Sequence, residues 1–242
     1  MTYCLAMRLD EGLLFLSDTR TNAGLDNVST FRKLHVLAPA PDRVFVLQAA
    51  GSLATTHEVL DRIGRDLAAP GDNGSLATVG HLFEAALYVG SISREVAREH
   101  EAELGPEGAA TFILGGQISG DRPDILLVYP EGNYIRASDE RPFLQIGESK
   151  YGKFMLELAV EAHVELPMAG KIALTSMLMT ARANLSVGPP YDLALYRNGA
   201  LAVEEARIEA ASPYLAELDA AWNGHLHRAI ADLPAVNPRA EL

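Results

Sequence analysis

Four short segments of this sequence carry the groups that an N-terminal nucleophile requires. Thr2 follows Met1 directly, Asp18 lies 16 residues after Thr2, Lys33 lies 15 residues after Asp18, and the small-residue segment Ala50-Gly51-Ser52 follows. Removal of Met1 would give Thr2 a nucleophilic hydroxyl and a free α-amine on the same residue. Because such an amine has a pKa of about 7.7–8.0, it can take the hydroxyl proton near neutral pH. The pattern therefore predicts acyl-transfer chemistry at Thr2.

Each of these residues also has an ordinary interpretation. A small residue at position 2 permits removal of the methionine whether or not it reacts. Asp18 could be a turn residue at a strand end, and Lys33 could be solvated, with Arg32 beside it as an equal candidate by composition. A small-residue segment before a helix could be only an N-cap. The functional interpretation depends on the segments occurring together.

Composition excludes several classes of function. Hydrophobic residues make up 48% of the 242 residues and charged residues 21%, as in globular proteins. The net charge of −12 argues against nucleic-acid binding, which requires Lys and Arg patches. The single cysteine, Cys4, excludes an internal disulfide and any multi-cysteine metal site. Because the sequence shows neither a membrane-spanning apolar run nor a secretion signal, we expect a cytoplasmic protein.

Hydrophobic periodicity predicts blocks of strands and helices in alternation. In the first strand, Tyr3, Leu5 and Met7 share one face, and Cys4 and Ala6 share the other. We expect strands at residues 2–8, 13–17, 32–37, 44–49, 111–114, 124–129, 133–137, 143–146, 191–196 and 201–208, a polar loop at 19–30 and a hairpin turn at Asn198-Gly199. We expect helices at 53–69 (stopped by Pro70-Gly71), from a Ser75 cap to about Leu104, and at 150–163, 171–184 and 213–232.

This order of elements predicts an α+β fold. Strands that arrive in hairpins pair antiparallel, and each sheet needs one face covered. Two antiparallel sheets packed together, with helix pairs on both outer faces, satisfy both demands as a four-layer αββα sandwich. No repeat, low-complexity tract or linker interrupts the sequence. We therefore expect a single domain over residues 1–242, with a flexible tail at 234–242.

Five further motifs accompany Thr2. They are LSDTRTNAG at residues 16–24, STFRK at 29–33, AGS at 50–52, IGESKYG at 146–152 and NLSVG at 184–188. With these motifs the sequence resembles the proteasome β-subunit branch of the N-terminal-nucleophile hydrolases. Within that branch it is most similar to Anbu, the bacterial proteasome-like family. The resemblance covers essentially the whole chain.

The resemblance implies a role for each residue of the first constellation. Thr2 would be the nucleophile, and Lys33 the buried ammonium that stabilises the developing alkoxide. Asp18 would keep Lys33 charged, because a desolvated lysine tends to lose its proton unless a carboxylate lies within about 4–6 Å. The Gly51 backbone N–H would bind the oxyanion of the tetrahedral intermediate. The candidate substrate-binding residues near this cleft are Arg20, Ala49 and Ser52.

One position departs from the proteasome pattern, which places an Asp directly after an Arg and three residues before a Ser. Here Ala183 follows Arg182, Asn184 comes next, and Ser186 occupies the serine position. Asn184 could substitute as a neutral hydrogen-bond acceptor for the α-amine. Ser149 is the candidate for the serine near that amine.

Other chemistry has little support in the sequence. Of the seven histidines, only His225 and His227 are close together, and residues two apart on a helix point away from each other. We therefore expect no metal site. Gly115-Gly116 and Gly120 do not form a dinucleotide fingerprint, because no helix is expected to start there. We expect no cofactor.

The resemblance implies a threonine endopeptidase that cleaves peptides or unfolded proteins through an acyl-enzyme on Thr2. It would work as a self-compartmentalising homo-oligomer, either a ring or an open spiral, and methionine aminopeptidase alone would mature it. Two alternatives remain open: a small-amide N-terminal-nucleophile amidohydrolase, and a non-catalytic proteasome-like scaffold subunit. The family also implies ATP-grasp and transglutaminase-like proteins as partners.

Overall fold

The computed structural model describes residues 2–22, 28–69 and 74–236. Four features named from the sequence lie outside these ranges. They are the processing site at Met1, the end of the motif at Ala23 and Gly24, the helix stop at Pro70-Gly71, and the tail from residue 237 onward.

The first sheet is antiparallel throughout, with its strands in the order β10-β1-β2-β11-β12. These strands are β1 (Tyr3–Leu9), β2 (Gly12–Asp18), β10 (Phe143–Gly147), β11 (Tyr191–Arg197) and β12 (Val203–Ile208). The alternation predicted for β1 is confirmed. Tyr3, Leu5 and Met7 belong to the core beneath the helices, whereas Cys4 and Ala6 belong to the core between the two sheets.

The second sheet is also antiparallel, in the order β5-β6-β7-β8-β9. These strands are β5 (Leu34–Ala40), β6 (Arg43–Gly51), β7 (Ala110–Ile118), β8 (Asp124–Val128) and β9 (Tyr134–Arg136). Along β6, Val44 and Val46 face the first sheet, while Phe45 and Leu47 pack against helices. The inner strands of both sheets therefore bury both of their faces.

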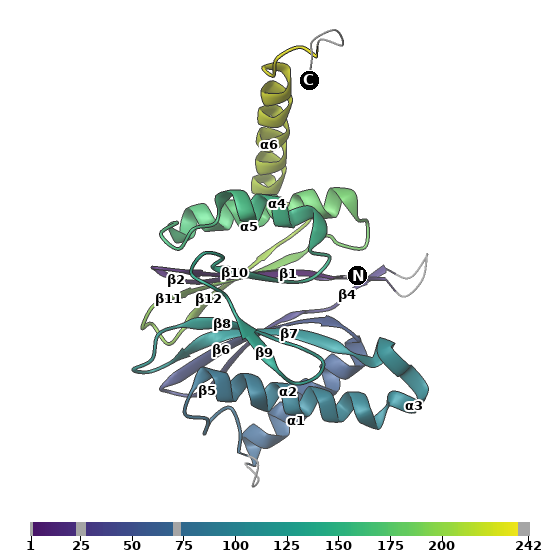
Figure 1. The fold of residues 1–242 in the computed structure, drawn as a ribbon, viewed down its shortest axis with the longest axis vertical. Coiled ribbons are helices and arrows are strands. Elements are labelled where there is room, and N and C mark those ends of the chain that lie inside the picture. Colours follow the sequence, from purple (N-terminus) through teal and green to yellow (C-terminus); the bar gives the residue numbers. More distant parts are fainter. Residues whose placement is uncertain (1, 23–27, 70–73, 237–242) are drawn as a thin grey trace.

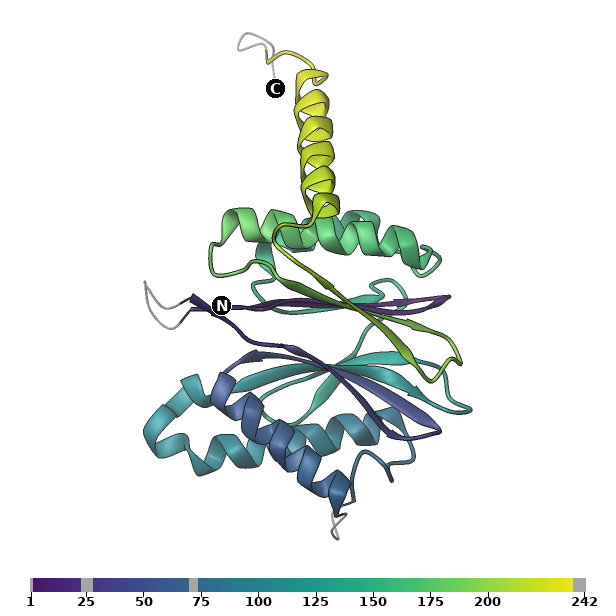
Figure 2. The same ribbon diagram turned by 180° about the vertical axis from the view of Figure 1, so that it is seen from behind.

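Helices cover the two outer faces, as Figures 1 and 2 show. The second sheet is covered by α1 (Leu53–Ala68) and α2 (Leu82–Glu99), and the first sheet by α4 (Lys150–Ala159) and α5 (Leu166–Ala183). The order of layers is helices, sheet, sheet, helices. The protein has the α+β, four-layer αββα sandwich that the sequence predicts.

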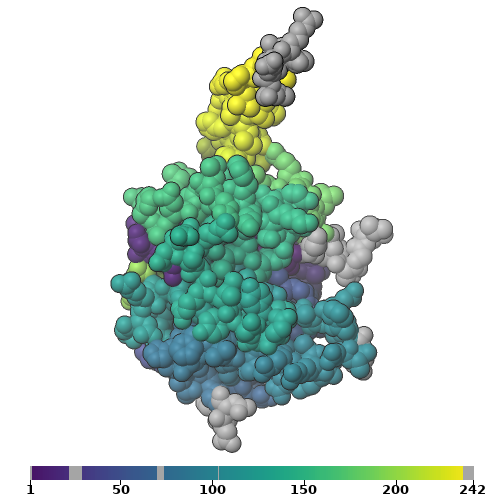
Figure 3. Space-filling model, viewed as in Figure 1, coloured from purple at the N-terminus to yellow at the C-terminus, as the bar shows by residue number. Residues whose placement is uncertain are grey.

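The last helix, α6 (Pro213–Ala231), stands out from the body of the protein (Figures 1 and 3). Leu215 is its buried residue among those described, and Arg182 of α5 forms an ion pair with Asp219 of α6 at 3.0 Å. Across the described ranges, no helix combines the length and the apolar character needed to cross a membrane.

The predicted second helix is wrong at both ends. It begins at Leu82 rather than near Ser75 and ends at Glu99, with short turns at α3 (Glu101–Leu104) and a 3-10 segment (Gly105–Gly108) behind it. Ser75 instead closes a local turn, in which Thr78 donates its backbone N–H to the Ser75 carbonyl at 2.9 Å. The Glu84 carboxylate accepts from the backbone N–H of His81 at 3.1 Å and so caps the true start.

Two loop predictions are also wrong. The polar segment at 19–30 contains a short hairpin of β3 (Arg20–Asn22) and β4 (Val28–Thr30), because backbone pairing does not require an apolar face. The turn at Asn198-Gly199 does not close a two-residue hairpin, since the last paired residues are Tyr196 and Val203. The Gly199 N–H donates to Gln117 Oε1 of β7 at 2.8 Å, which draws this loop toward the other sheet.

Candidate active site

Thr2 is held by the backbone of the segment that follows β10. Its carbonyl accepts a hydrogen bond from the Glu148 N–H at 2.6 Å. Gly147, which precedes Glu148, has a φ of +83°, and a Cβ atom there would lie 2.0 Å from the Thr2 carbonyl oxygen. Only glycine lets the two chains approach this closely. The position of Thr2 therefore depends on a contact between residues far apart in the sequence.

Asp18 connects three separate segments at the end of β2. Its Oδ1 accepts from Lys33 Nζ at 2.8 Å and from the Tyr3 N–H at 3.0 Å. Its Oδ2 accepts a longer hydrogen bond from the Gly188 N–H at 3.4 Å. Lys33 Nζ also donates to the Arg20 carbonyl at 2.7 Å. One carboxylate thus positions both the candidate ammonium and the residue next to the candidate nucleophile.

The Asp18–Lys33 ion pair is buried. The Asp18 side chain is 0% exposed and that of Lys33 is 6% exposed. Burial raises the pKa of the Asp18 carboxyl, and the Lys33 ammonium and the hydrogen-bond donors around it act in the opposite direction. Removing one partner would leave the other charge buried and uncompensated. The structure therefore selects Lys33, and not the half-exposed Arg32, as the cation of this pair.

A cavity of about 150 Å³ opens beside this pair. Its lining residues are Thr2, Thr21, Arg32, Lys33, Ala49, Ala50, Gly51, Leu53 and Thr56. Four residues singled out from the sequence, namely Thr2, Lys33, Ala49 and Gly51, thus meet at one opening. A cavity of this size accommodates a side chain rather than a whole ligand.

Two of the expected substrate-binding residues have other contacts. The Arg20 guanidinium packs against Gly188 and donates to the Leu185 carbonyl at 2.8 Å, so Arg20 fastens the 185–188 segment rather than lining the cavity. Ser52 caps α1, and its Oγ accepts from the Thr55 N–H at 3.2 Å. Ser52 is likewise not among the residues that line the cavity. Both therefore act beside the cavity and not within it.

The residues expected near the α-amine lie in two segments. Asn184 follows α5 directly, and its Oδ1 accepts from the Ser186 N–H at 3.0 Å. The Asn184 Nδ2 donates to Glu148 Oε2, also at 3.0 Å. Ser149 precedes α4, where its backbone N–H donates to the Gly147 carbonyl at 3.0 Å and its side chain makes no capping bond. Asn184 and Glu148 thus join these segments.

The sequence alone did not identify Gly147, Glu148 and Gly188 as residues of the site. Glu148 and Gly147 fall within a quoted motif, but nothing in their residue types or spacing assigned them a role. Gly188 also lies in a motif, and its N–H binds Asp18 across 170 residues of sequence. A signal existed for Gly147, because glycine is the residue that best tolerates a positive φ, but the chain that packs against it is visible only in three dimensions.

Tyr3 anchors the start of β1 on the helix side of the sheet. Its hydroxyl is 2.8 Å from Ser176 Oγ of α5 and accepts from Gln145 Nε2 at 2.5 Å. Ser176 in turn donates to the Gly152 carbonyl of α4 at 3.0 Å. Burial raises the pKa of the Tyr3 hydroxyl to about 12, so the group stays protonated at neutral pH. This network fixes the residue that follows Thr2.

Two other places combine polar side chains. A larger cavity of about 760 Å³ lies beside the far end of β1, where Arg8 pairs with Asp124 at 3.2 Å and with Asp139 at 2.7 Å. It contains none of the residues of the Thr2 site. Arg8, Asp124 and Asp139 are already engaged in ion pairs there, whereas the smaller cavity contains the candidate nucleophile, so we regard the smaller cavity as the functional one.

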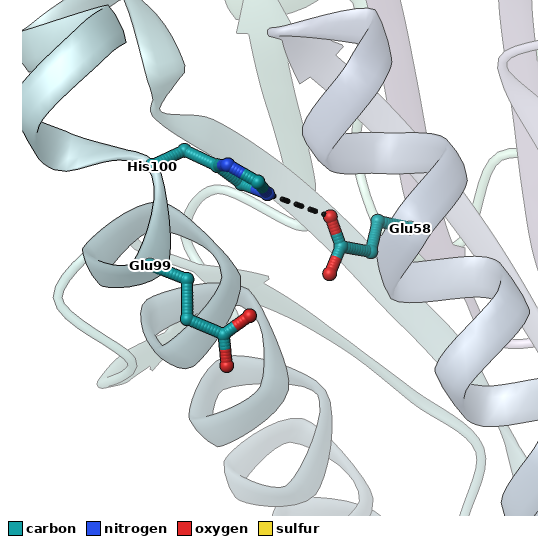
Figure 4. Close-up of side chains that lie close together, drawn as sticks. All are labelled: Glu58, Glu99 and His100. Carbon is teal, nitrogen blue, oxygen red and sulfur yellow. Dashed lines mark hydrogen bonds and ion pairs between the residues drawn. The ribbon is translucent and has the colours of Figure 1, made fainter.

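The second place is a group of side chains of the types that can bind a metal, on the surface formed by α1 and α2 (Figure 4). Ligand atoms of Glu58, Glu99 and His100 lie within 4.8 Å of one another, and His100 Nε2 is 3.0 Å from Glu58 Oε2. The Arg62 guanidinium forms ion pairs with both glutamates. Because arginine keeps its charge at any physiological pH, Arg62 offsets part of the negative charge of these carboxylates. The group is accounted for as an ion-pair network between two helices.

Solved structures of high similarity span nearly the whole chain. Anbu (ancestral beta-subunit) from Yersinia bercovieri is 39% identical with a TM-score of 0.93, covering 99% of this chain and 100% of its own. Anbu from Hyphomicrobium sp. strain MC1 is 41% identical with a TM-score of 0.90, covering 98% and 100%. A helical assembly of the Anbu complex from Pseudomonas aeruginosa is 38% identical with a TM-score of 0.93, covering 99% and 100%. No protein-family model and no curated protein matches the chain.

Proposed function

The chain belongs to the Anbu family of proteasome-like proteins, and from this premise we propose that it is a threonine-type peptidase with Thr2 as its nucleophile. The observation that carries the proposal is the shared oxygen of Asp18, which binds both Lys33 Nζ and the N–H of Tyr3. A buried ion pair is expensive to desolvate, so its presence beside Thr2 calls for a reason other than stability. Catalysis at Thr2 supplies that reason.

The proposed reaction begins after removal of Met1. The α-amine of Thr2 accepts the proton of its hydroxyl as Oγ attacks the scissile carbonyl, and the Gly51 N–H and the Lys33 ammonium stabilise the oxyanion and the alkoxide. Collapse of the tetrahedral intermediate returns the proton to the departing amine and leaves an acyl ester on Thr2. Water, deprotonated by the same α-amine, then releases the acid and regenerates the hydroxyl.

Peptides fit the cavity better than small free amides do. Its volume of about 150 Å³ holds one side chain, and the open side leaves the rest of a chain outside. A small-amide hydrolase would enclose its whole substrate, which usually requires about 300 Å³ or more. We therefore favour peptide or unfolded-protein substrates over small amides.

Reaction with a peptide epoxyketone tests the nucleophile, because this reagent requires a hydroxyl and a free amine on one residue. We expect intact-protein mass spectrometry to show one adduct per chain, located on Thr2, in protein that lacks Met1. The variant Thr2→Ala should form no adduct, and the exposed Thr30→Ala should react as the wild type does.

Other results would contradict the peptidase proposal. Retained Met1, or a free Thr2 that never reacts, would favour the scaffold subunit. A reactive Thr2 that hydrolyses acyl-amino acids but no fluorogenic peptide would favour the amidohydrolase.

We also propose that the protein works as a homo-oligomer, and α6 supports this. Leu226 and Ile230, four residues apart on α6, are 39% and 65% exposed, and Phe154 and Leu158 on α4 are 68% and 67% exposed. A helix with so little buried surface is marginal in water by itself. A second copy of the chain would cover these faces, in keeping with the helical assembly of the Pseudomonas relative.

Light scattering tests the assembly. We expect wild-type protein to form a particle of many subunits, and Leu226→Ser combined with Ile230→Ser to lower its mass by at least half, because two apolar contacts per helix are lost. Glu217→Ser, an exposed change on the same helix, should leave the mass unchanged. A wild-type protein that is strictly monomeric would contradict the proposal.

A further inference from the structure

Glu148 lies between the candidate nucleophile and the end of α5. Its backbone N–H donates to the Thr2 carbonyl at 2.6 Å, and its carboxylate accepts from Asn184 Nδ2 at 3.0 Å. The side chain is half-buried. No role was assigned to it from the sequence. Its contacts nevertheless connect Thr2 to the segment where the proteasome pattern has a carboxylate and this chain has Ala183.

The end of the β1–β10 pairing brings the backbone of Glu148 against that of Thr2. Strands β1 and β10 are antiparallel, with Cys4 opposite Ile146 and Tyr3 opposite Gly147. Continued by one residue, this register sets Thr2 opposite Glu148, in agreement with the backbone bond between them.

The hydrogen bonds of Asn184 fix which side of its amide faces Glu148. The Ser186 N–H can only donate, so it binds the Asn184 oxygen. An ionised carboxylate can only accept, so Glu148 binds the Asn184 nitrogen. Asn184 therefore presents a donor to Glu148 and has no free oxygen turned toward it. The Asn184 oxygen, which the sequence suggested as a neutral acceptor for the α-amine, is turned toward the Ser186 N–H.

Glu148 lacks a cation. Within residues 2–22, 28–69 and 74–236, no ion pair involves its carboxylate, and Asn184 is its side-chain hydrogen-bond partner. A half-buried carboxylate is normally compensated by a positive charge or by several donors. An α-amine on Thr2, which appears only after Met1 is removed, would be a cation of the right sign at this place.

We propose that Glu148 is the carboxylate that holds the Thr2 α-amine, with Asn184 as the positioning residue that orients Glu148. This inference rests on the proposed function, since it requires that Thr2 become the N-terminus. The proteasome pattern places this carboxylate at the end of α5. In this chain the carboxylate is that of Glu148, in the segment after β10. The lack of a carboxylate at Ala183 then leaves the negative charge of the site in place, because Glu148 supplies that charge from another segment.

Other charged groups surround Thr2 from each neighbouring element. Asp18 on β2 and Lys33 before β5 compensate each other. Arg32, which lines the cavity, pairs with Asp192 on β11 and Glu205 on β12. Lys150 at the start of α4 is exposed. Glu148 is thus the negative group near Thr2 that is not already paired with a positive one among the described residues.

Glu148 should raise the pKa of the α-amine, because a nearby negative charge favours the protonated form. Glu148→Gln keeps an oxygen that can accept from Asn184 and removes only the charge. We expect the variant to lower the midpoint of α-amine titration by about one pH unit or more, as a single charge at about 4–6 Å does. Glu148→Asp keeps the charge, so the midpoint of α-amine titration in this variant should differ from the wild-type midpoint by less than about half of that shift.

Competitive acetylation of the Thr2 amine across a pH series, read by mass spectrometry of the N-terminal peptide, measures this midpoint without any substrate. Glu157→Gln, a change in a surface ion pair of α4, is the matched control and should leave the midpoint unchanged. The acid limb of the peptidase pH profile should move with the midpoint.

The outcomes separate the two claims. A shifted midpoint in a protein without peptidase activity supports the Glu148 assignment and overturns the proposed function. An active peptidase whose midpoint is not moved by Glu148→Gln overturns the assignment and leaves the function intact. An N-terminal peptide that still begins with Met1 overturns both, and its mass shows this directly.

Discussion

Lys33→Met is expected to lower the rate of epoxyketone adduct formation at Thr2 by at least about a hundredfold. Lys33 Nζ is the buried cation of the site, 2.8 Å from Asp18 Oδ1, and it lines the same cavity as Thr2. Loss of one electrostatic stabiliser in a desolvated site typically costs about 10²–10³ in rate. Methionine keeps the length of the side chain and removes the charge. Rates at saturating and at low reagent concentration would separate chemistry from binding.

Lys33→Met alone also destabilises the fold, so a second variant is required to separate the effect on stability from the effect on catalysis. It leaves the 0% exposed Asp18 carboxylate unpaired, which typically costs about 3–5 kcal/mol. The double variant Asp18→Asn, Lys33→Met removes both charges and keeps an acceptor for the Tyr3 N–H. We expect it to recover most of the stability in urea unfolding and none of the rate. Loss of rate without loss of stability would locate the effect in catalysis.

The pH dependence of the single variant provides an internal check. Burial already raises the pKa of Asp18, and loss of the Lys33 charge removes the main group that lowers it. A carboxyl whose folded pKa lies above its unfolded value gains stability as pH falls toward and below the unfolded value. Lys33→Met should therefore become relatively more stable as pH falls through the raised folded pKa of Asp18 toward the ordinary carboxyl range, and the double variant should not.

Two controls decide whether the assignment to Lys33 is right. Lys153→Met removes an exposed charge on α4 and should leave rate and stability unchanged. Arg32 was an equal candidate from composition, although its side chain is 51% exposed. If Arg32→Met slowed adduct formation as much as Lys33→Met does, while remaining as stable as the wild type, the assignment of Lys33 as the catalytic cation would be wrong.

The fold was largely predictable because its signals are local. Alternation of Tyr3, Leu5 and Met7 with Cys4 and Ala6 identifies a strand with two buried faces, and hairpins that follow one another dictate antiparallel sheets. Local signals failed where two of them compete for one helix start, or where a distant residue decides the structure. The start of α2 depends on Glu84 reaching back to His81 rather than on Ser75. The loop after β11 depends on Gln117 of the other sheet.

The candidate site shows the same division. Residue type, spacing and the family resemblance together suggested Thr2, Asp18, Lys33 and Gly51, because each must carry a particular group, although composition alone left Arg32 equal to Lys33. These signals do not identify residues whose role depends on a contact formed only in the folded structure. The sequence suggested Arg20 as a substrate contact from its place near the cleft, whereas its guanidinium fastens the 185–188 segment. The link from Glu148 to Thr2 and Asn184 joins residues 36 or more apart and becomes visible only once the strands are paired.

Gly147→Ala is expected to be the most damaging change of one methyl group near the site. The Gly147 φ is +83°, and an added Cβ would lie 2.0 Å from the Thr2 carbonyl oxygen and 2.7 Å from its carbon. Neither atom is the end of a flexible side chain, so the backbone of β1 or β10 must move. That movement would break the 2.6 Å bond from the Glu148 N–H to Thr2. A displacement of about 1 Å at reacting groups can cost about 10² in rate.

We therefore expect Gly147→Ala to slow epoxyketone adduct formation by at least about a hundredfold and to lower the free energy of unfolding by about 2 kcal/mol or more. The matched control is Gly170→Ala on α5, where an added Cβ meets no atom within 4 Å. That change should raise the free energy of unfolding by up to about 1 kcal/mol and leave the adduct rate as it is. If Gly147→Ala reacted as fast as Gly170→Ala, the close contact with β10 would not set the position of Thr2. Reactivity would then depend on Asp18 and Lys33 alone, which hold Thr2 only through the N–H of Tyr3.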